Sequence, residues 1–87
     1  MIYVDEVREY HTDVIKGLWC HMWTDEEDES GLHALAKSIN IKRTWFQTDN
    51  QRFRHYDLSK SKRALALKHG AVFMPLKDWI NSRKIQE

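Results

Sequence analysis

Side-chain types alternate strictly along residues 18–24. One set of alternate positions is aliphatic or small, and the other is aromatic with a histidine in its middle. The two sets are Leu18, Cys20 and Met22, and Trp19, His21 and Trp23. Because successive residues of a strand point to opposite faces of a sheet, this pattern predicts a strand with one face in the core and one face suited to binding or catalysis.

Two shorter segments also have strand character. Residues 2–7 begin with β-branched and aromatic side chains, and residues 71–74 are apolar and stop at Pro75. Residues 8–17, between the first two predicted strands, are polar and end at a glycine, so they are expected to form a loop.

Three segments have helical character. An acidic run over residues 25–29 precedes apolar residues spaced along one helical face, namely Leu32, Leu35, Ala36 and Ile39. Asn40 is a suitable C-terminal residue for this first helix.

The second helix is expected over residues 60–69, after Ser59 as N-cap and before Gly70 as a left-handed stop. Its apolar members are Ala64, Leu65 and Leu67. A last helix over residues 76–84 would turn Trp79 and Ile80 inward.

These elements follow in the order β-β-α-α-β-α, with a turn-rich loop over residues 42–54 between the first two helices. The order predicts a single α+β domain spanning residues 1–87, in which a small three-stranded sheet packs with about three helices. Loops of this length in compact domains are often functional.

The composition is typical of a small cytoplasmic protein. The single cysteine, Cys20, cannot form an internal disulfide and lies among apolar residues, as expected for a buried thiol in a reducing compartment. The N-terminus lacks the basic and apolar segments of a secretory signal. No run approaches the roughly 20 apolar residues of a membrane span, so no membrane partner is expected.

Charge is unevenly distributed, although the net charge is only +1. Residues 1–31 carry nine acidic and two basic residues, whereas residues 32–87 carry twelve basic and four acidic ones. The two halves could pair within the fold or between subunits of a homo-oligomer, or leave a basic face for phosphate. Binding to duplex nucleic acid is not expected, because dedicated nucleic-acid domains are usually much more basic.

Several short segments occur in an order that resembles a known family. They are Tyr3-Val4-Asp5, Trp19-Cys20-His21-Met22, Leu32-His33-Ala34-Leu35-Ala36, Trp45-Phe46-Gln47, His55-Tyr56-Asp57 and Lys62-Arg63-Ala64-Leu65-Ala66, followed by Gly70-Ala71-Val72. This order covers most of residues 2–75 and resembles the domain of unknown function 4031 family, small proteins of bacteria and their phages. The chain departs from that pattern by a longer acidic insert at residues 25–31 and an extra stretch at residues 50–54.

The family brings no settled reaction. A phage setting would favour a role in host interaction over metabolism. What the resemblance implies is a set of pattern residues, namely Asp5, His21, His33, His55, Tyr56 and Asp57.

The segment from His55 to Ser59 places an imidazole and a carboxylate two residues apart, so that they share one face if the backbone is extended. Asp57 could orient His55 and favour its charged form. His55 would then be a general acid or base, with His21 as a second catalytic member, as in a phosphodiesterase. The chain has no nucleophile elbow and no glycine-rich phosphate loop, which weakens the case for turnover.

The histidines and acids also form a candidate metal set. With Asp5, the candidate ligands His21, His33, His55 and Asp57 supply the nitrogen and oxygen atoms that bind Zn²⁺, Mn²⁺ or Fe²⁺. Their spacing matches no standard zinc motif, and His33 could equally pin its helix to a buried partner. A metal-dependent hydrolase is therefore an alternative, with a divalent cofactor that the spacing does not favour.

The favoured interpretation is a pocket for an anionic, nucleotide-like ligand, used by a phage protein that acts on host nucleotide signalling. Aromatic side chains and cations lie close to His55 in the sequence, and bases stack on aromatic rings while phosphates accept charge-assisted hydrogen bonds. The candidate ligand-binding residues are Asp5, Trp19, His21, Trp23, His33, Trp45, Arg54, His55, Tyr56, Asp57, Lys60 and Arg63. A third class, a protein-interaction module that inhibits a host protein, would use exposed tryptophans and the opposed charges.

Overall fold

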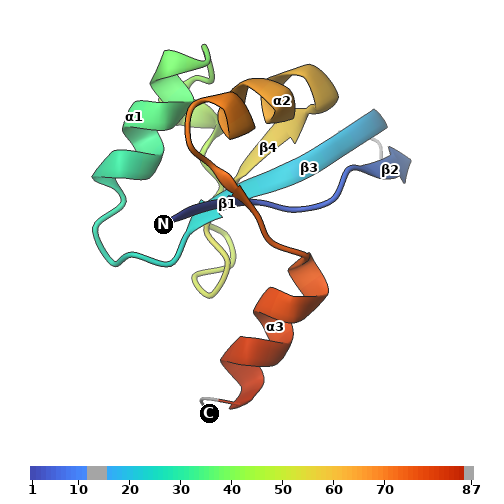
Figure 1. Cartoon of the computed structure of the whole chain (residues 1–87), viewed down its shortest axis with the longest axis vertical. Coiled ribbons are helices and arrows are strands. Elements are labelled where there is room, and N and C mark those ends of the chain that lie inside the picture. Colours follow the sequence, from blue (N-terminus) through green and yellow to red (C-terminus); the bar gives the residue numbers. More distant parts are fainter. Residues whose placement is uncertain (12–15, 86–87) are drawn as a thin grey trace.

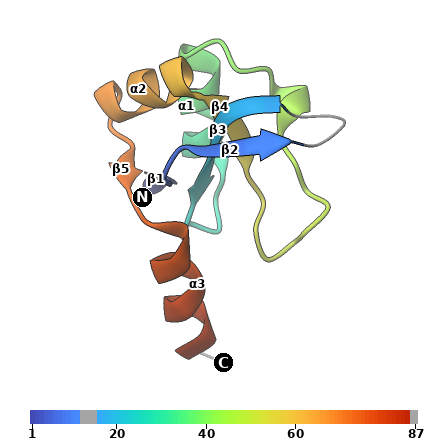
Figure 2. The same ribbon diagram turned by 90° about the vertical axis from the view of Figure 1, so that its right-hand side faces the viewer.

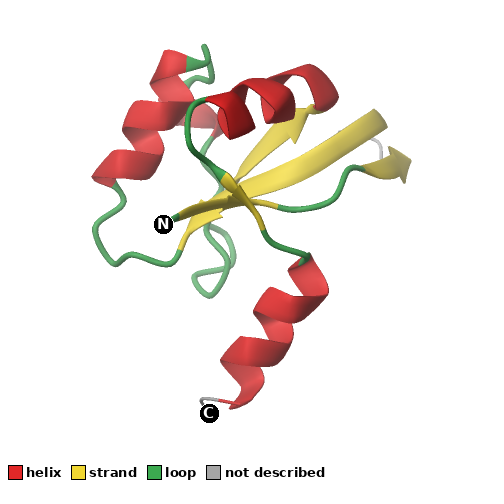
Figure 3. Ribbon diagram, viewed as in Figure 1, coloured by secondary structure: helices red, strands yellow, loops and turns green. Residues whose placement is uncertain are grey.

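The computed structural model describes residues 1–11 and 16–85 (Figure 1). Its strands are β1 (Ile2–Val4), β2 (Arg8–His11), β3 (Lys16–Thr24), β4 (Tyr56–Ser59) and β5 (Val72–Phe73). Its helices are α1 (Ser30–Ser38), α2 (Lys60–Lys68) and α3 (Leu76–Ile85), with a 3₁₀ turn, η1, at Arg43–Trp45. The predicted α+β class is confirmed, but the sheet within the described residues has five strands where the sequence pattern predicts three (Figure 3).

The sheet is organised around β3, its longest strand. β4 pairs antiparallel with one edge of β3, and β1 and β2 pair antiparallel with the two ends of the other edge. β5 extends the sheet by pairing parallel with β1. In the β3–β4 ladder, His21 lies opposite Asp57 and Trp19 opposite Ser59. This register brings residues more than thirty positions apart in the sequence to one place.

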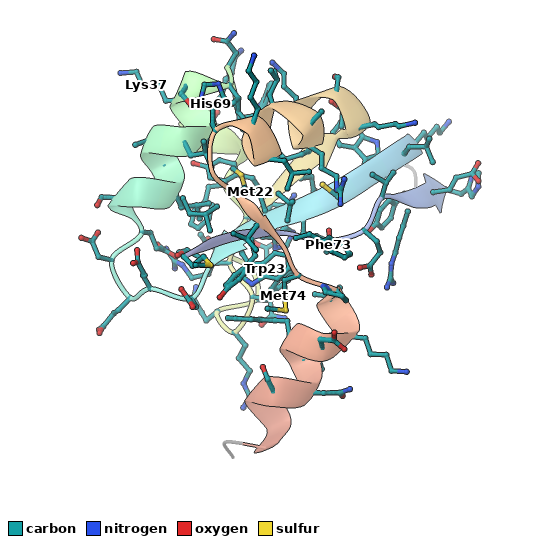
Figure 4. The ribbon with its side chains drawn as sticks, in the orientation of Figure 1. Met22, Trp23, Lys37, His69, Phe73 and Met74 are labelled. Carbon is teal, nitrogen blue, oxygen red and sulfur yellow. The ribbon has the colours of Figure 1, made fainter. Side chains whose placement is uncertain are left out.

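The two faces of β3 have different surroundings. Cys20 and Met22 are buried on the face that α1 and α2 cover, which we call the helix-covered face. Trp19, His21 and Trp23 point to the opposite side, which we call the open face. Figure 4 shows Met22 on the side of α1 and α2 and Trp23 on the other side, toward α3, and the turned view of Figure 2 shows α1 and α2 together above the sheet.

The core lies on the helix-covered face. Its fully buried members from three strands and the helices pack as one cluster, which includes Val4, Cys20, Met22, Leu32, Leu35, Ala36, Ile39, Tyr56, Leu58 and Ala66. Cys20 is a free buried thiol, as predicted, and burial raises its pKa to about 12. Leu18 departs from the prediction: it is 49% exposed, because its end of β3 pairs with β2 and extends past the helices.

The strand predictions need three corrections. The strand predicted over residues 2–7 ends at Val4. Residues 8–11, predicted as loop, form β2, whose polar sequence suits a mostly exposed strand at the margin of the sheet. Residues 12–15 of the same predicted loop lie outside the described residues. Residues 56–59 form β4, although the sequence pattern predicts no strand there and only places the start of the following helix at residue 60.

The ends of the helices agree with the sequence-based predictions better than their buried faces do. The hydroxyl of Ser59 accepts a hydrogen bond from the backbone N–H of Lys62, and Gly70 has a φ of +109°, as their predicted roles as N-cap and stop require. Asn40 likewise has a φ of +63° just beyond α1. The acids at residues 25–29 precede α1 instead of occupying its first turn.

The inward sides of α2 and α3 differ from the prediction. α2 buries Ala66, whose small side chain permits close approach to the sheet, while Ala64 and Leu65 are exposed and Leu67 is half-buried. In α3, Trp79 packs against Tyr3 and Trp23 as expected, but Ile80 is exposed. α3 projects from the rest of the fold, so that only one of its sides meets the sheet (Figure 1).

None of the helices in the described part of the chain combines the length and the apolar character that crossing a membrane would require.

Candidate functional site

Three side chains converge on the open face. His21 comes from β3, Asp57 lies opposite it on β4, and His55 directly precedes β4. One ligand atom from each of these residues lies within 4.8 Å of the other two. We call this cluster the His21–His55–Asp57 triad. It forms because the β3–β4 register aligns two polar positions on the side of the sheet that α1 and α2 do not cover.

Asp5 fixes the orientation of His21. Its carboxylate is fully buried and accepts two hydrogen bonds from the same residue, one from the backbone N–H at 2.6 Å and one from ring Nδ1 at 2.7 Å. Because a carboxylate can only accept, the hydrogen of a neutral His21 ring stays on Nδ1. The lone pair of Nε2 then points toward the triad, as in carboxylate–histidine pairs that support a metal.

The backbone fixes His55 in the same manner. Its Nδ1 lies 2.8 Å from the carbonyl oxygen of Phe53, which can only accept a hydrogen bond. The Phe53 ring also stacks on the His55 ring, with centroids 4.7 Å apart. The Nε2 atom of His55 is therefore presented to the triad, as that of His21 is.

Asp57 supplies the third ligand atom. Its Oδ1 lies 3.4 Å from Nε2 of His55 and 4.0 Å from Nε2 of His21. Its other oxygen, Oδ2, accepts a hydrogen bond from the side-chain amide of Gln47. Gln47 thus leaves Oδ1 directed at the two imidazoles.

The environment of the triad shifts the pKa values of His55 and Asp57 in opposite directions. Burial opposes the charge on His55, but the hydrogen bonds to Asp57 and to the Phe53 carbonyl outweigh it and raise the pKa of His55. Burial likewise opposes the charge on Asp57, but hydrogen bonds from His55 and Gln47 and the positive charge of His55 lower its pKa. Both shifts favour the charged forms, so between the ordinary pKa values of 3.8 and 6.5 the two side chains form an ion pair when nothing else binds them.

The triad has the composition and spacing of a divalent transition-metal site. Two imidazoles and one carboxylate are the protein ligands of many Zn²⁺ and Fe²⁺ centres that keep positions open for water or substrate. Ligands at zinc–ligand distances in a tetrahedral site lie roughly 3.3 Å from one another. Oδ1 of Asp57 lies 3.4 and 4.0 Å from the two Nε2 atoms, and the three ligand atoms lie within 4.8 Å of one another, so the cluster would have to contract to reach that geometry.

Two hollows adjoin the triad, one on each side along β3. The acidic hollow has a volume of about 450 Å³ and is lined in part by Phe53, whose ring stacks on that of His55. It is lined by Trp23, Thr24, Asp25, Glu26, Glu27, Glu29, Gln51, Arg52, Phe53, Arg54 and Trp79. The Trp45 groove, of about 490 Å³, shares Asp57 and Gln47 with the triad. It is lined by Trp19, Ile41, Thr44, Trp45, Phe46, Gln47, Asp57, Ser59 and Lys62.

His33 lies outside the triad. Its Nδ1 is 2.8 Å from the hydroxyl of Tyr56, and its ring meets Phe46 edge-on at 4.7 Å. Burial, and then the nearby charge of Arg43, lower the pKa of His33 and so favour its neutral form. The arrangement matches the interpretation in which His33 pins its helix to a buried partner.

The other residues proposed for ligand binding are scattered. Tyr56 is fully buried in the core, so its ring offers no free stacking face. Arg54 pairs with Glu29 at 2.9 Å in the wall of the acidic hollow. Arg63 donates to the backbone carbonyl of Asp5, which supports the strand end that carries this carboxylate. Lys60 is exposed and lines neither hollow.

Sequence reasoning missed three contributors to the site. Gln47 orients Asp57, the Phe53 carbonyl orients His55, and the half-buried Tyr10 ring lies edge-on to His21 with centroids 6.2 Å apart. Burial, and then the charge of Asp5, raise the pKa of Tyr10. Only Gln47 had a sequence signal, since it belongs to the Trp45-Phe46-Gln47 segment that contributes to the family resemblance.

Comparison with known proteins gives one match. Residues 2–86 match the family described as "Protein of unknown function (DUF4031)", which confirms the resemblance over nearly the whole chain. No curated protein and no solved structure gives a significant match. These comparisons assign no activity to the chain, so its proposed function rests on the geometry of the open face.

Proposed function

This chain belongs to the family of proteins of unknown function DUF4031, and we propose that it is a metal-dependent hydrolase whose single divalent ion binds to His21, His55 and Asp57. One observation carries the proposal: one ligand atom from each residue lies within 4.8 Å of the other two, with Oδ1 of Asp57 3.4 Å from Nε2 of His55 and 4.0 Å from Nε2 of His21. The sequence-based candidate set included His33, which the proposal leaves out because that ring is bonded to Tyr56.

The surroundings of the triad support a metal more than an accidental cluster. Each imidazole is bonded through Nδ1 to a group that can only accept, so when both rings are neutral both Nε2 lone pairs are free to bind, and a metal would displace the proton that His55 shares with Asp57. A buried carboxylate such as Asp5 is costly unless its charge is well paired, so its place behind His21 suits a site that will carry positive charge. A chance grouping of surface residues would not need this support.

A set of three protein ligands supports hydrolysis over a purely structural metal. Structural zinc sites usually use four protein ligands, whereas three protein ligands leave a position for water or substrate. A metal held there would lower the pKa of its bound water to about 7 and so supply hydroxide at neutral pH. Tyr10 and Gln47 would position the histidine and the carboxylate around that water.

Metal analysis and a generic hydrolysis assay test the proposal. The full chain would be stripped with a chelator, reloaded with Zn²⁺ or Mn²⁺, and assayed with bis(4-nitrophenyl) phosphate. We expect one bound ion per chain and metal-dependent release of 4-nitrophenol. His55→Ala should lower metal affinity by more than about 100-fold, because even the loss of an outer-shell partner costs 10- to 100-fold.

His11→Ala is the matched control, since His11 is an exposed histidine that pairs only with Glu9 in the described contacts. This variant should bind metal as the parent does. A parent protein that takes up no ion would contradict the proposal, and so would a His55→Ala variant that binds as tightly as the parent. Hydrolysis that persists in chelator would point instead to acid–base catalysis by His21 and His55.

A further inference from the structure

We propose that the Trp45 groove binds the base of a nucleotide, or a closely similar planar aromatic group, while the phosphate of the same molecule lies at the His21–His55–Asp57 triad. The inference rests on the proposed hydrolase function and names the substrate class of that site. It also decides which of the two hollows beside the triad the substrate occupies.

The groove and the triad are continuous. Asp57 directs one oxygen at the imidazoles, and the same side chain lines the groove. Gln47, which holds the other oxygen of Asp57, also lines the groove. In the β3–β4 ladder, the Trp19–Ser59 pair of the groove lies two residues from the His21–Asp57 pair. A ligand in the groove would therefore reach the triad without crossing another element.

The surface of the groove suits a planar apolar group at its far end. Trp45 is half exposed there, and Trp19 is held in place because its indole N–H donates to the carbonyl of Lys16 at 2.8 Å. Phe46 is less available for stacking, since it is buried, at 8% exposed. The volume of about 490 Å³ falls within the range of small-ligand sites.

Charge distinguishes the two hollows. Four carboxylates and two arginines line the acidic hollow, and one of those arginines is already paired with Glu29. In the Trp45 groove, Lys62 balances Asp57, and the ammonium of Lys42 lies 5.5 Å from the Trp45 ring. A divalent ion on the triad would add positive charge at the groove end nearest Asp57. An anionic aromatic molecule is therefore expected in the Trp45 groove and not in the acidic hollow.

Indole N–H signals of the four tryptophans test this placement. The ¹⁵N-labelled, Zn²⁺-loaded full chain would be titrated with each of the four common ribonucleoside 5′-monophosphates, and with ribose 5-phosphate as a phosphate that lacks a base. We expect at least one nucleotide to move the signals of Trp45 and Trp19 and to leave those of Trp23 and Trp79 unchanged. Ribose 5-phosphate should move none of the four.

Trp45→Ala should lower nucleotide affinity by roughly 10- to 100-fold, the size of one lost stacking contact. Its metal stoichiometry should stay that of the parent, because Trp45 is exposed and does not contact the triad in the described contacts. The matched control is Glu27→Ala, which changes an exposed residue of the acidic hollow and should leave nucleotide affinity unchanged.

The readouts separate the two proposals. If the chain binds metal but nucleotides move Trp23 and Trp79, or move no indole signal, the groove assignment is overturned while the hydrolase proposal stands. If the chain binds no metal but nucleotides still move Trp45 and Trp19, the groove assignment stands and the hydrolase proposal falls. An unchanged nucleotide affinity in Trp45→Ala would also overturn the groove assignment.

Discussion

The two faces of β3 carry different kinds of side chain and have different roles. On the helix-covered face, Cys20 and Met22 are buried in an apolar cluster that any well-shaped hydrophobic residues could form. On the open face, His21 is held from behind by a buried carboxylate and presents an unshared ring nitrogen to two other polar groups. The apolar groups of the helix-covered face are satisfied by packing against one another. The polar groups of the open face can still bind a ligand. That difference is the reason for assigning function to the open face.

The largest effect on stability is expected from a substitution on the helix-covered face. Leu58→Ala removes a fully buried side chain from the helix-covered face and should lower the free energy of unfolding by about 2–5 kcal/mol. Leu18→Ala, at an exposed position of β3, should change it by less than about 0.5 kcal/mol. Urea unfolding of the metal-free proteins measures both. Equal losses in the two variants would mean that the helices do not cover the face as described.

Asp5→Asn tests whether the open face depends on its buried support. The amide that replaces the carboxylate oxygen can present N–H groups to Nδ1 of His21, which would push the ring hydrogen onto Nε2 and block the metal position. Metal affinity should fall by about 10- to 100-fold. Asp25→Asn is the control, because Asp25 is exposed and pairs with the N-terminal amine, and it should leave the affinity unchanged. Calorimetric titration with Zn²⁺ compares them, and parent-like binding by Asp5→Asn would remove Asp5 from the site.

The pH dependence of stability tests the ion pair of the metal-free triad. The raised pKa of His55 gives a stabilising contribution that is complete below its ordinary value of 6.5 and is lost as the pH rises through the raised value. The lowered pKa of Asp57 gives a contribution that is present above 3.8 and is lost as the pH falls through the lowered value. The pair should therefore stabilise most between these two ordinary values.

His33 works against this trend, because its lowered pKa makes the fold less stable as the pH falls below 6.5. His33 contributes equally to the unfolding free energies of the parent and of His55→Gln. Its contribution therefore cancels when one free energy is subtracted from the other. This difference should be largest between the ordinary pKa values of 3.8 and 6.5 and should shrink as the pH rises through the raised pKa of His55. A difference that stays constant or grows with pH would show that His55 and Asp57 are not paired.

The smallest expected effect concerns Ser59, which links the two faces. Its side chain lines the Trp45 groove together with Trp19 and Asp57 of the open face, and it also caps α2, which covers the other face. Ser59→Ala should lower the free energy of unfolding by about 1 kcal/mol through the lost cap. Ser61→Ala, at an exposed position two residues later, removes only a hydroxyl contact to Ser59 at 3.2 Å and should change it by less than about 0.5 kcal/mol. Thermal unfolding resolves the two, and no loss in Ser59→Ala would show that the cap does not stabilise α2.

The sequence patterns correctly predicted features of the fold that depend only on neighbouring residues. The alternation along residues 20–23 identified the two faces of β3, and the types of Ser59 and Gly70 identified the ends of α2. These features depend on side-chain period, capping and backbone freedom, which neighbouring residues determine. The polar strand β2 was missed because its residues carry no apolar alternation and pair at the margin of the sheet.

The candidate site depends on register, which no local pattern reports. His21 and Asp57 were proposed as site residues from their types, but only the β3–β4 ladder places them opposite each other. Asp5 was proposed as a ligand-binding residue, and its burial behind His21 assigns it a supporting position. His33 has the same chemistry as His21 and His55, yet a tyrosine from the core side of β4 occupies its ring nitrogen. Residue type alone could not separate these cases.

Diffraction from crystals soaked in Zn²⁺ tests the central claim most directly, because anomalous scattering locates the ion without reference to activity. We predict one strong anomalous peak on the open face, about 2.0–2.1 Å from Nε2 of both His21 and His55 and within about 2.2 Å of an Asp57 oxygen. A crystal that shows no peak at this position, or only peaks at exposed groups such as the His11–Glu9 pair, would contradict the assignment of the triad as a metal site.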